Sequence, residues 1–318
     1  MYAEHVTELY GLPVRNFRHD DDSPDPLPDD PGSVAWRLAT DAWDSSFDDF
    51  EENFRRFLDA VDPGAVRALV IGPWGEAYEN DSRVVVKLLA GAADRFTALR
   101  AVFLGDLVAE EAEISWIEQS DVTPVLRAYP ALEEFAVRGG TDLSLEAVRH
   151  DALKSLRFEA GGLPGGVVRA VAAAELPALE ELTLWLGVGE YGGDATVADL
   201  APLLAGGRLP ALRRLAVCNS EIEDEIAVAV AAAPVVAQLE ELDLSMGVLT
   251  DTGAEALLTG QPLTHLRRLR LAHHYLTTAM MRRLTAALEP AGVGLDLSEQ
   301  LTPDTYDGEV WHYTAVME

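Results

Sequence analysis

The sequence predicts an α/β solenoid, in which short parallel strands form one curved sheet and helices cover its convex side. Three observations predict this fold. A six-residue apolar pattern recurs along the chain, the copies start every 21 to 33 residues, and a helical pattern with its own start signal follows the strands. Because one such strand and helix cannot bury their apolar faces alone, neighbouring units must stack.

The recurring pattern is Leu-x-x-Leu-x-Leu, the signature of a leucine-rich repeat. Four copies match it closely, and four weaker copies precede them along the chain. A ninth strand is expected near Leu295 and Leu297, so the solenoid is predicted to span residues 66–298. The eight copies occupy 66–71, 99–104, 132–137, 153–158, 179–184, 212–217, 239–244 and 266–271.

Helix start signals lie between the strands and before the first of them. A Ser or Thr stands before each apolar run with helical spacing, and in two cases an Asp three residues later completes a capping box. Strand and helix are therefore expected to alternate throughout, which requires a parallel sheet. The signals are Ser46 with Asp49, Ser82, Thr196 with Asp199, and Thr277.

The stretch LEELDLSMGVLTDTGAEALL at 239–258 resembles the ribonuclease-inhibitor-like class of leucine-rich repeats. Where that class has Asn or Cys in the turn, this chain has Ser220, Gly247 and His274, so we expect a less regular turn. The whole chain, including ISWIEQSDVTP and NSEIEDEIA, also resembles a family of uncharacterised cytoplasmic bacterial leucine-rich-repeat proteins. That resemblance implies genes beside ATP-grasp-like and radical-SAM-like enzymes, and it implies no activity.

Two candidate caps flank the repeats, because the end units of a solenoid otherwise expose core. The first, residues 1–65, contains a strand pattern at 33–40 and an aromatic-rich helix pattern at 45–61. It also contains an acidic, proline-rich segment at 17–32, which we expect to form an extended loop. The second, residues 299–318, contains an alternating strand that either pairs with the last edge strand or folds back onto the solenoid.

Charge and cysteine content narrow the class of partner. The net charge of −30 repels phosphate backbones and anionic lipid, so neither nucleic acid nor a membrane is expected as a partner. A basic partner is favoured, although acidity can also serve only to keep a protein in solution. The single cysteine, Cys218, and the absence of a signal-like amino terminus indicate the cytoplasm.

Charges on the predicted strands alternate in sign from one strand to the next, from Glu133 and Lys154 to Glu240 and Arg267. Such a ladder is expected to pair with itself, which leaves the concave positions for a ligand. We predict an exposed patch of aromatic residues and arginines on the concave face, with further contacts from the loops that leave the strands. The predicted partner-binding residues are Trp74, Phe103, Asp106, Arg138, Arg157, Trp185, Tyr191, Asp243 and Arg270.

The sequence predicts a non-catalytic scaffold or adaptor that binds a protein or peptide, with no cofactor and no metal. The adjacent histidines His273 and His274 would face opposite sides of a strand, so they are poorly placed to share an ion. Two alternatives stay open. One is a small-ligand or enzymatic site built from loop carboxylates with Trp74, Trp116 and Tyr191; the other is a specificity subunit for a neighbouring enzyme. Trp116 itself fits either the core or an interface.

Overall fold

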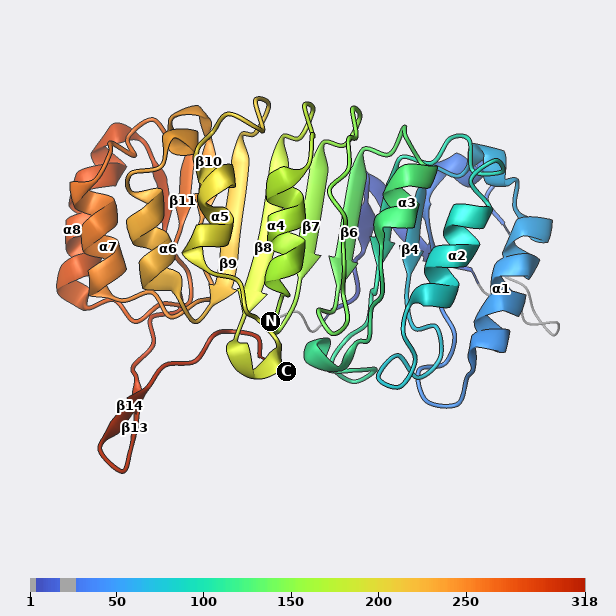
Figure 1. Ribbon diagram of the computed structural model, residues 1–318, viewed down its shortest axis with the longest axis horizontal. Coiled ribbons are helices and arrows are strands. Elements are labelled where there is room, and N and C mark those ends of the chain that lie inside the picture. The colour runs from blue at the N-terminus through green and yellow to red at the C-terminus, as the bar shows by residue number, and fades with distance from the viewer. Residues whose placement is uncertain (1–3, 18–26, 318) are drawn as a thin grey trace.

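The computed structural model describes residues 4–17 and 27–317. Within them the chain forms one curved sheet of twelve strands, eight α-helices and a separate two-stranded hairpin. The sheet strands follow one another in chain order, and the helices form a layer over one face of the sheet (Figure 1). This mixed α/β arrangement is solenoid-like, as the repeat spacing predicts. Residues 18–26, most of the predicted acidic loop, lie outside the described residues.

All nine predicted repeat strands are present and in parallel register, so that prediction is confirmed. The strand expected at 33–40 is present as well, as β3 (Ala35–Leu38). The repeat strands are β4 (Ala68–Ile71), β5 (Ala101–Leu104), β6 (Glu134–Arg138), β7 (Ser155–Glu159), β8 (Glu181–Gly187), β9 (Arg214–Ser220), β10 (Glu241–Asp243), β11 (Arg268–Arg270) and β12 (Gly294–Asp296).

The register aligns equivalent leucines of neighbouring repeats. Leu182 pairs with Leu215, Leu215 with Leu242, and Leu242 with Leu269. All four side chains are buried, and burying each stabilises the fold by about 1.5–3 kcal/mol. Each leucine therefore packs against copies of itself in the adjacent repeats, and this continuous row forms the core between sheet and helices.

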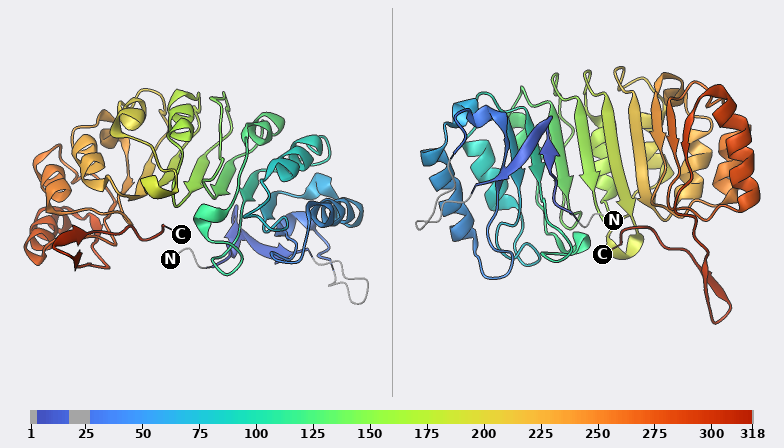
Figure 2. Two further views of the ribbon diagram at one scale, coloured as in Figure 1. Left: turned by 60° about the horizontal axis from the view of Figure 1, so that its bottom comes forward. Right: turned by 180° about the vertical axis from the view of Figure 1, so that it is seen from behind.

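The helices lie on the convex side of the arch and the sheet lines its inner side (Figure 2). Helices begin directly after all four predicted start signals, and capping boxes are present at Ser46 and Thr196. None of the helices in the described residues is long and apolar enough to cross a membrane. The helices are α1 (Phe47–Ala60), α2 (Arg83–Gly91), α3 (Thr123–Ala128), α4 (Gly165–Ala173), α5 (Val197–Leu204), α6 (Glu223–Val230), α7 (Asp251–Thr259) and α8 (Thr278–Leu288).

The expected alternation of strand and helix fails at one place. Residues 139–154, which join β6 to β7, contain no helix. These two repeats start at 132 and 153, the shortest spacing in the chain, and a strand plus two turns leaves too few residues for a helix. The buried ring of His150 helps to fill the gap: its Nδ1 accepts the backbone N–H of Leu153 at 3.1 Å.

The amino-terminal segment, which the sequence did not identify as strand, covers half of the concave face. Strands β1 (Glu8–Leu9) and β2 (Leu12–Asn16) form a hairpin through Tyr10 and Gly11, both with positive φ, as a tight two-residue turn requires. The apolar side chains of residues 6–14 pack on the inner face of β3 to β6. A second apolar core therefore lies beneath this segment, on the side that the repeat pattern marks as exposed.

The carboxyl-terminal segment also returns to the concave side. Strands β13 (Asp304–Tyr306) and β14 (Glu309–Trp311) pair only with each other and form a hairpin that projects from the body (Figure 1). Residues 313–316 then run back across the carboxyl ends of β9 to β11. Of the two arrangements considered for this tail, pairing with the edge strand is wrong and folding back onto the solenoid is confirmed.

Candidate functional site

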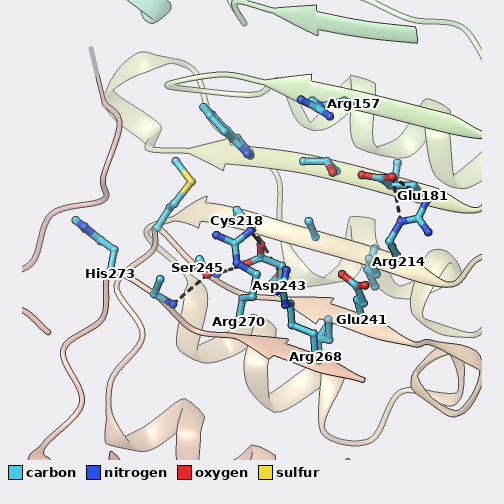
Figure 3. Close-up of a pocket in the computed structure, with 18 of the residues that line it drawn as sticks. Arg157, Glu181, Arg214, Cys218, Glu241, Asp243, Ser245, Arg268, Arg270 and His273 are labelled. Atoms are coloured by element: carbon cyan, nitrogen blue, oxygen red, sulfur yellow. Dashed lines mark hydrogen bonds and ion pairs between the residues drawn. The ribbon is translucent and has the colours of Figure 1, made fainter. Parts of the chain in front are cut away.

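The open half of the concave face holds a pocket of about 420 Å³. It lies over strands β7 to β11, beyond the area covered by the amino-terminal segment. Its floor combines arginines and acids with Trp185 and Cys218 (Figure 3). The charged residues of the lining are Arg157, Glu159, Glu181, Arg214, Glu241, Asp243, Arg268, Arg270 and Glu299, and His273 lies among them.

Ion pairs between neighbouring strands order the floor of this pocket. Arg214 Nη2 lies 3.0 Å from the carboxylate of Glu181, and Arg270 Nη1 lies 3.2 Å from that of Asp243. The same alternation continues at the edge of the sheet nearest the strand starts, where the predicted ladder is confirmed for Glu133 with Lys154 and for Glu240 with Arg267. Exposed pairs of this kind add little stability, so their charges stay available to a ligand at low cost.

The pocket is closed on one side by the chain's own tail. Asn219, fully buried and in the left-handed region at φ 54°, pairs with both backbone groups of Val316. Its Nδ2 donates to the Val316 carbonyl at 2.6 Å, and its Oδ1 accepts the Val316 N–H at 2.9 Å. Ala315, which donates to the Met246 carbonyl at 2.8 Å, lines the pocket. The structure thus places an extended peptide along this edge.

Four of the predicted binding residues are not accessible, and the prediction of an exposed patch is wrong for them. Phe103 is 1% exposed because the amino-terminal segment packs on its ring, and Trp74 is buried with its indole N–H donating to the Asn80 carbonyl at 2.9 Å. Asp106 and Arg138 are buried in ion pairs. The other five predicted residues are half-buried or exposed: Arg157, Trp185, Asp243 and Arg270 in the pocket lining, and Tyr191 in the loop after β8.

Asp106 and Arg138 belong to a chain of alternating charges that runs beneath the amino-terminal segment to the pocket. Arg37 Nε lies 2.8 Å from Asp106, whose other oxygen lies 3.9 Å from Arg138 Nη1. Arg138 Nε lies 2.8 Å from Glu159, and Glu159 lies 3.3 Å from the half-exposed Arg157. This series of ion pairs therefore connects the covered half of the concave face to the open half.

Cys218, in the pocket lining, and Glu223 are both buried. Burial raises the pKa of the Cys218 thiol well above its ordinary value, and the nearby Asp243 carboxylate raises it further. The thiol is thus protonated and packs as a small apolar group. Burial, followed by the charges of Asp243 and Asp224, likewise raises the pKa of Glu223 well above its usual range. Neither Glu223 oxygen has a hydrogen-bond partner among the described residues.

Replacing Glu223 with Gln should stabilise the protein, and increasingly so as the pH rises. A carboxyl whose pKa is higher in the folded state holds its proton there but loses it on unfolding, so stability falls as the pH rises above the unfolded pKa near 4.5. Gln cannot ionise and avoids that loss. We expect a gain of about 1–3 kcal/mol at pH 8 and little at pH 5, measured by urea unfolding.

Glu225→Gln, at an exposed position of the same helix α6, is the matched control and should show no such pH dependence. Equal pH profiles for Glu223→Gln and the parent protein would contradict a buried, neutral carboxyl at residue 223.

The two adjacent histidines are held apart, but not by alternation on a strand: both follow β11, and His273 has a left-handed backbone at φ 58°. His274 is buried: its Nδ1 accepts the Leu276 N–H at 3.1 Å, and its Nε2 lies 3.1 Å from the Leu297 carbonyl. His273 instead contacts the tail, with Nε2 3.0 Å from the Tyr313 carbonyl. Among the described residues, no group of three or more His, Cys, Asp or Glu side chains is arranged to hold a metal ion.

Trp116, which the sequence left open between core and interface, lies on the surface. Its side chain is 56% exposed, while the adjacent Ile117 is fully buried. The loop therefore uses Ile117 to cover the core and presents Trp116 to solvent.

Sequence reasoning missed Asn219 and the tail it binds. The signal available in the sequence was an asparagine directly after the apolar residues of a repeat strand. The structure shows why Asn suits this position, since its backbone has a positive φ that Asn tolerates. Nothing in the tail residues 313–316 marks them as its partner.

No family model and no curated protein matches the chain. A protein of Bacteroides fragilis, solved by crystallography as a structural genomics target, is similar to it: 31% identical, with a TM-score of 0.76, over 85% of this chain and 76% of that one. The TLR13–ssRNA13 complex matches at 15% identity and a TM-score of 0.33, over 76% of this chain and 34% of that one, too low to support an argument. The chain belongs to the same protein family as the Bacteroides fragilis protein.

Proposed function

We propose that this chain is a leucine-rich-repeat protein of horseshoe form, a non-catalytic scaffold that captures an extended segment of another protein in the concave pocket. The observation that carries the proposal is the pocket itself. It is open, about 420 Å³ in volume, and lined by Trp185 and by arginines paired with acids on neighbouring strands. Trp and Arg are enriched among the residues that dominate binding energy at protein interfaces.

The chain's own tail supports an extended peptide as ligand. Asn219 recognises the backbone of Val316 through two hydrogen bonds and thus without regard to its side chain. A partner segment beside this tail would lie across the strands, between Trp185 and Arg270. Lining charges of both signs suit a segment that carries charges of both signs, including a basic one.

Two features favour binding over catalysis at this site. The Cys218 thiol is buried and its pKa is raised, so it is a poor nucleophile. Trp74, one of the three aromatic residues of the small-ligand or enzymatic alternative, is buried away from solvent. We further propose that the protein acts in the cytoplasm, on the ground of its single cysteine and of the sequence resemblance. The alternative role of a specificity subunit for a neighbouring enzyme rests on that resemblance alone.

Selection of displayed random peptides against the full-length protein tests the proposal. We expect the best peptide to bind Trp185→Ala and Arg270→Met with a Kd raised about five-fold or more, measured by titration calorimetry. Trp43→Ala removes an exposed tryptophan far along the chain from the pocket strands and should leave the Kd unchanged. The exposed Arg270→Met should keep the thermal midpoint of the parent protein, and circular dichroism checks that Trp185→Ala, whose ring packs partly against the core, stays folded.

Two outcomes would contradict peptide capture in the pocket. One is selected peptides whose binding none of the pocket substitutions affects. The other is a stoichiometric small molecule found by native mass spectrometry in protein purified without denaturation, which would favour the small-ligand alternative.

A further inference from the structure

The carboxyl-terminal hairpin carries large side chains that contribute nothing to the solenoid core. Tyr306 is 74% exposed, Val310 60%, and Trp311 47%. The hairpin stands away from the body in Figure 1 and in the right view of Figure 2. A two-stranded hairpin is at best marginally stable in water, and exposed aromatic residues add no stability unless something covers them.

One face of the hairpin combines aromatic rings with carboxylates. Asp304 pairs with Trp311, and Tyr306 pairs with Glu309, in antiparallel register. Because side chains alternate between the faces of a strand, these four residues share one face. Together with Tyr313, the residues Asp304, Tyr306 and Trp311 border a shallow hollow of about 470 Å³.

The carboxyl-terminal part of the sequence that forms the hairpin carries acidic charge. From residue 284 to residue 318 the sequence contains seven acids and neither lysine nor arginine. A cation over the face of a Trp or Tyr ring is attracted by the ring's quadrupole, and adjacent carboxylates add to that attraction.

We propose that this face of the hairpin, formed by Asp304, Tyr306, Glu309 and Trp311, docks an arginine- or lysine-bearing segment of a partner protein. The site is separate from the concave pocket and does not depend on the function proposed for it. A second copy of this chain is a poor occupant, because its own hairpin and its net charge of −30 are acidic as well.

Anchors at both ends make the hairpin a defined surface rather than a loose tail. Before it, the Leu301 N–H donates to the His274 carbonyl at 2.8 Å. After it, the Tyr313 N–H donates to the Tyr275 hydroxyl at 2.7 Å, and His312 stacks edge-on against the Tyr275 ring. The hairpin is therefore presented at a fixed place, which lowers the entropy lost on binding.

Calorimetric titration of the full-length protein with an octapeptide of alternating arginine and glycine tests the proposal. We expect Tyr306→Ala and Trp311→Ala each to raise the Kd about five-fold or more. The double substitution Asp304→Asn with Glu309→Gln should raise it as well, with both rings retained. Since the hairpin lies outside the core, all these variants should keep the parent's circular dichroism and thermal midpoint.

Matched controls separate this site from the rest of the acidic surface. Trp43→Ala, at another exposed tryptophan between Asp41 and Asp44, should bind the peptide as the parent does. The same peptide with citrulline in place of arginine should not bind.

Three results would each overturn the proposal. If every variant binds alike, the peptide contacts the acidic surface diffusely. If the citrulline peptide binds equally well, the face recognises an apolar group rather than a cation. If sedimentation shows a dimer that Trp311→Ala abolishes, the occupant is a second copy of the chain.

Discussion

Replacing Arg138 with Met is expected to lower the free energy of unfolding by about 3–5 kcal/mol, because it removes the buried positive charge between two buried carboxylates, and Glu159 keeps only the half-exposed Arg157 as a partner. Arg138 is 4% exposed and lies between Asp106 and Glu159, which are buried as well. Methionine retains much of the packing volume but supplies no positive charge. Chemical denaturation monitored by circular dichroism measures the loss.

Two further variants identify the cause of that loss. Arg149→Met removes an arginine that pairs with Asp151 and Glu175 on the open surface, and it should change stability little. Adding Glu159→Met to Arg138→Met removes the buried carboxylate that lost its nearest arginine. This second substitution should recover part of the lost stability. If Arg138→Met costs no more than Arg149→Met, the alternating charges beneath the amino-terminal segment do not act as a buried network.

Replacing Phe103 with Ala should cost about 3–5 kcal/mol of stability, the usual range for a buried aromatic residue. The ring is 1% exposed, packs under the apolar side chains of residues 6–14 and lies 5.2 Å from the Arg138 guanidinium. Its loss should also loosen the amino-terminal segment. We therefore expect faster tryptic cleavage after Arg15 as well as a lower denaturation midpoint.

Trp43→Ala serves as the matched control, since this ring is 56% exposed, and it should cost far less than Phe103→Ala. A stable Phe103→Ala variant with impaired peptide binding would show that the concave face is open at this position in solution. That result would contradict the arrangement of strands β1 and β2.

The repeat strands and helices were predictable because each is specified locally. Leu182, Leu215, Leu242 and Leu269 recur at fixed positions, and only stacked parallel strands bury all four. The spacing of the repeats also indicates that no helix follows β6, since 21 residues are too few for a strand, a helix and two turns. It was overlooked because helix signals elsewhere suggested strict alternation.

The site was less predictable because it depends on segments outside the repeats. Their positions within the repeats place Phe103 and Trp185 on the same face of the sheet. In a solenoid without a covering segment both side chains would be exposed. Whether each is covered depends on a two-residue and a five-residue strand near the amino terminus, too short for any periodicity to reveal. Asp106 is covered by the same segment, since the Val6 N–H bonds to it, whereas Arg138 is buried with Glu159 and the Leu107 carbonyl. Trp185 lies beyond this covering segment, in the open pocket.

The two returning segments also affect how the protein unfolds. In a simple repeat stack each unit contacts only its neighbours, so the ends fray independently of the middle. Here the Val6 N–H bonds to Asp106 across 100 residues of sequence, and Asn219 bonds to Val316 across 97. Each end of the chain is thereby fastened to an interior repeat, and opening either end requires breaking contacts near the centre. Such long-range fastening favours concerted unfolding over stepwise loss of repeats from the ends.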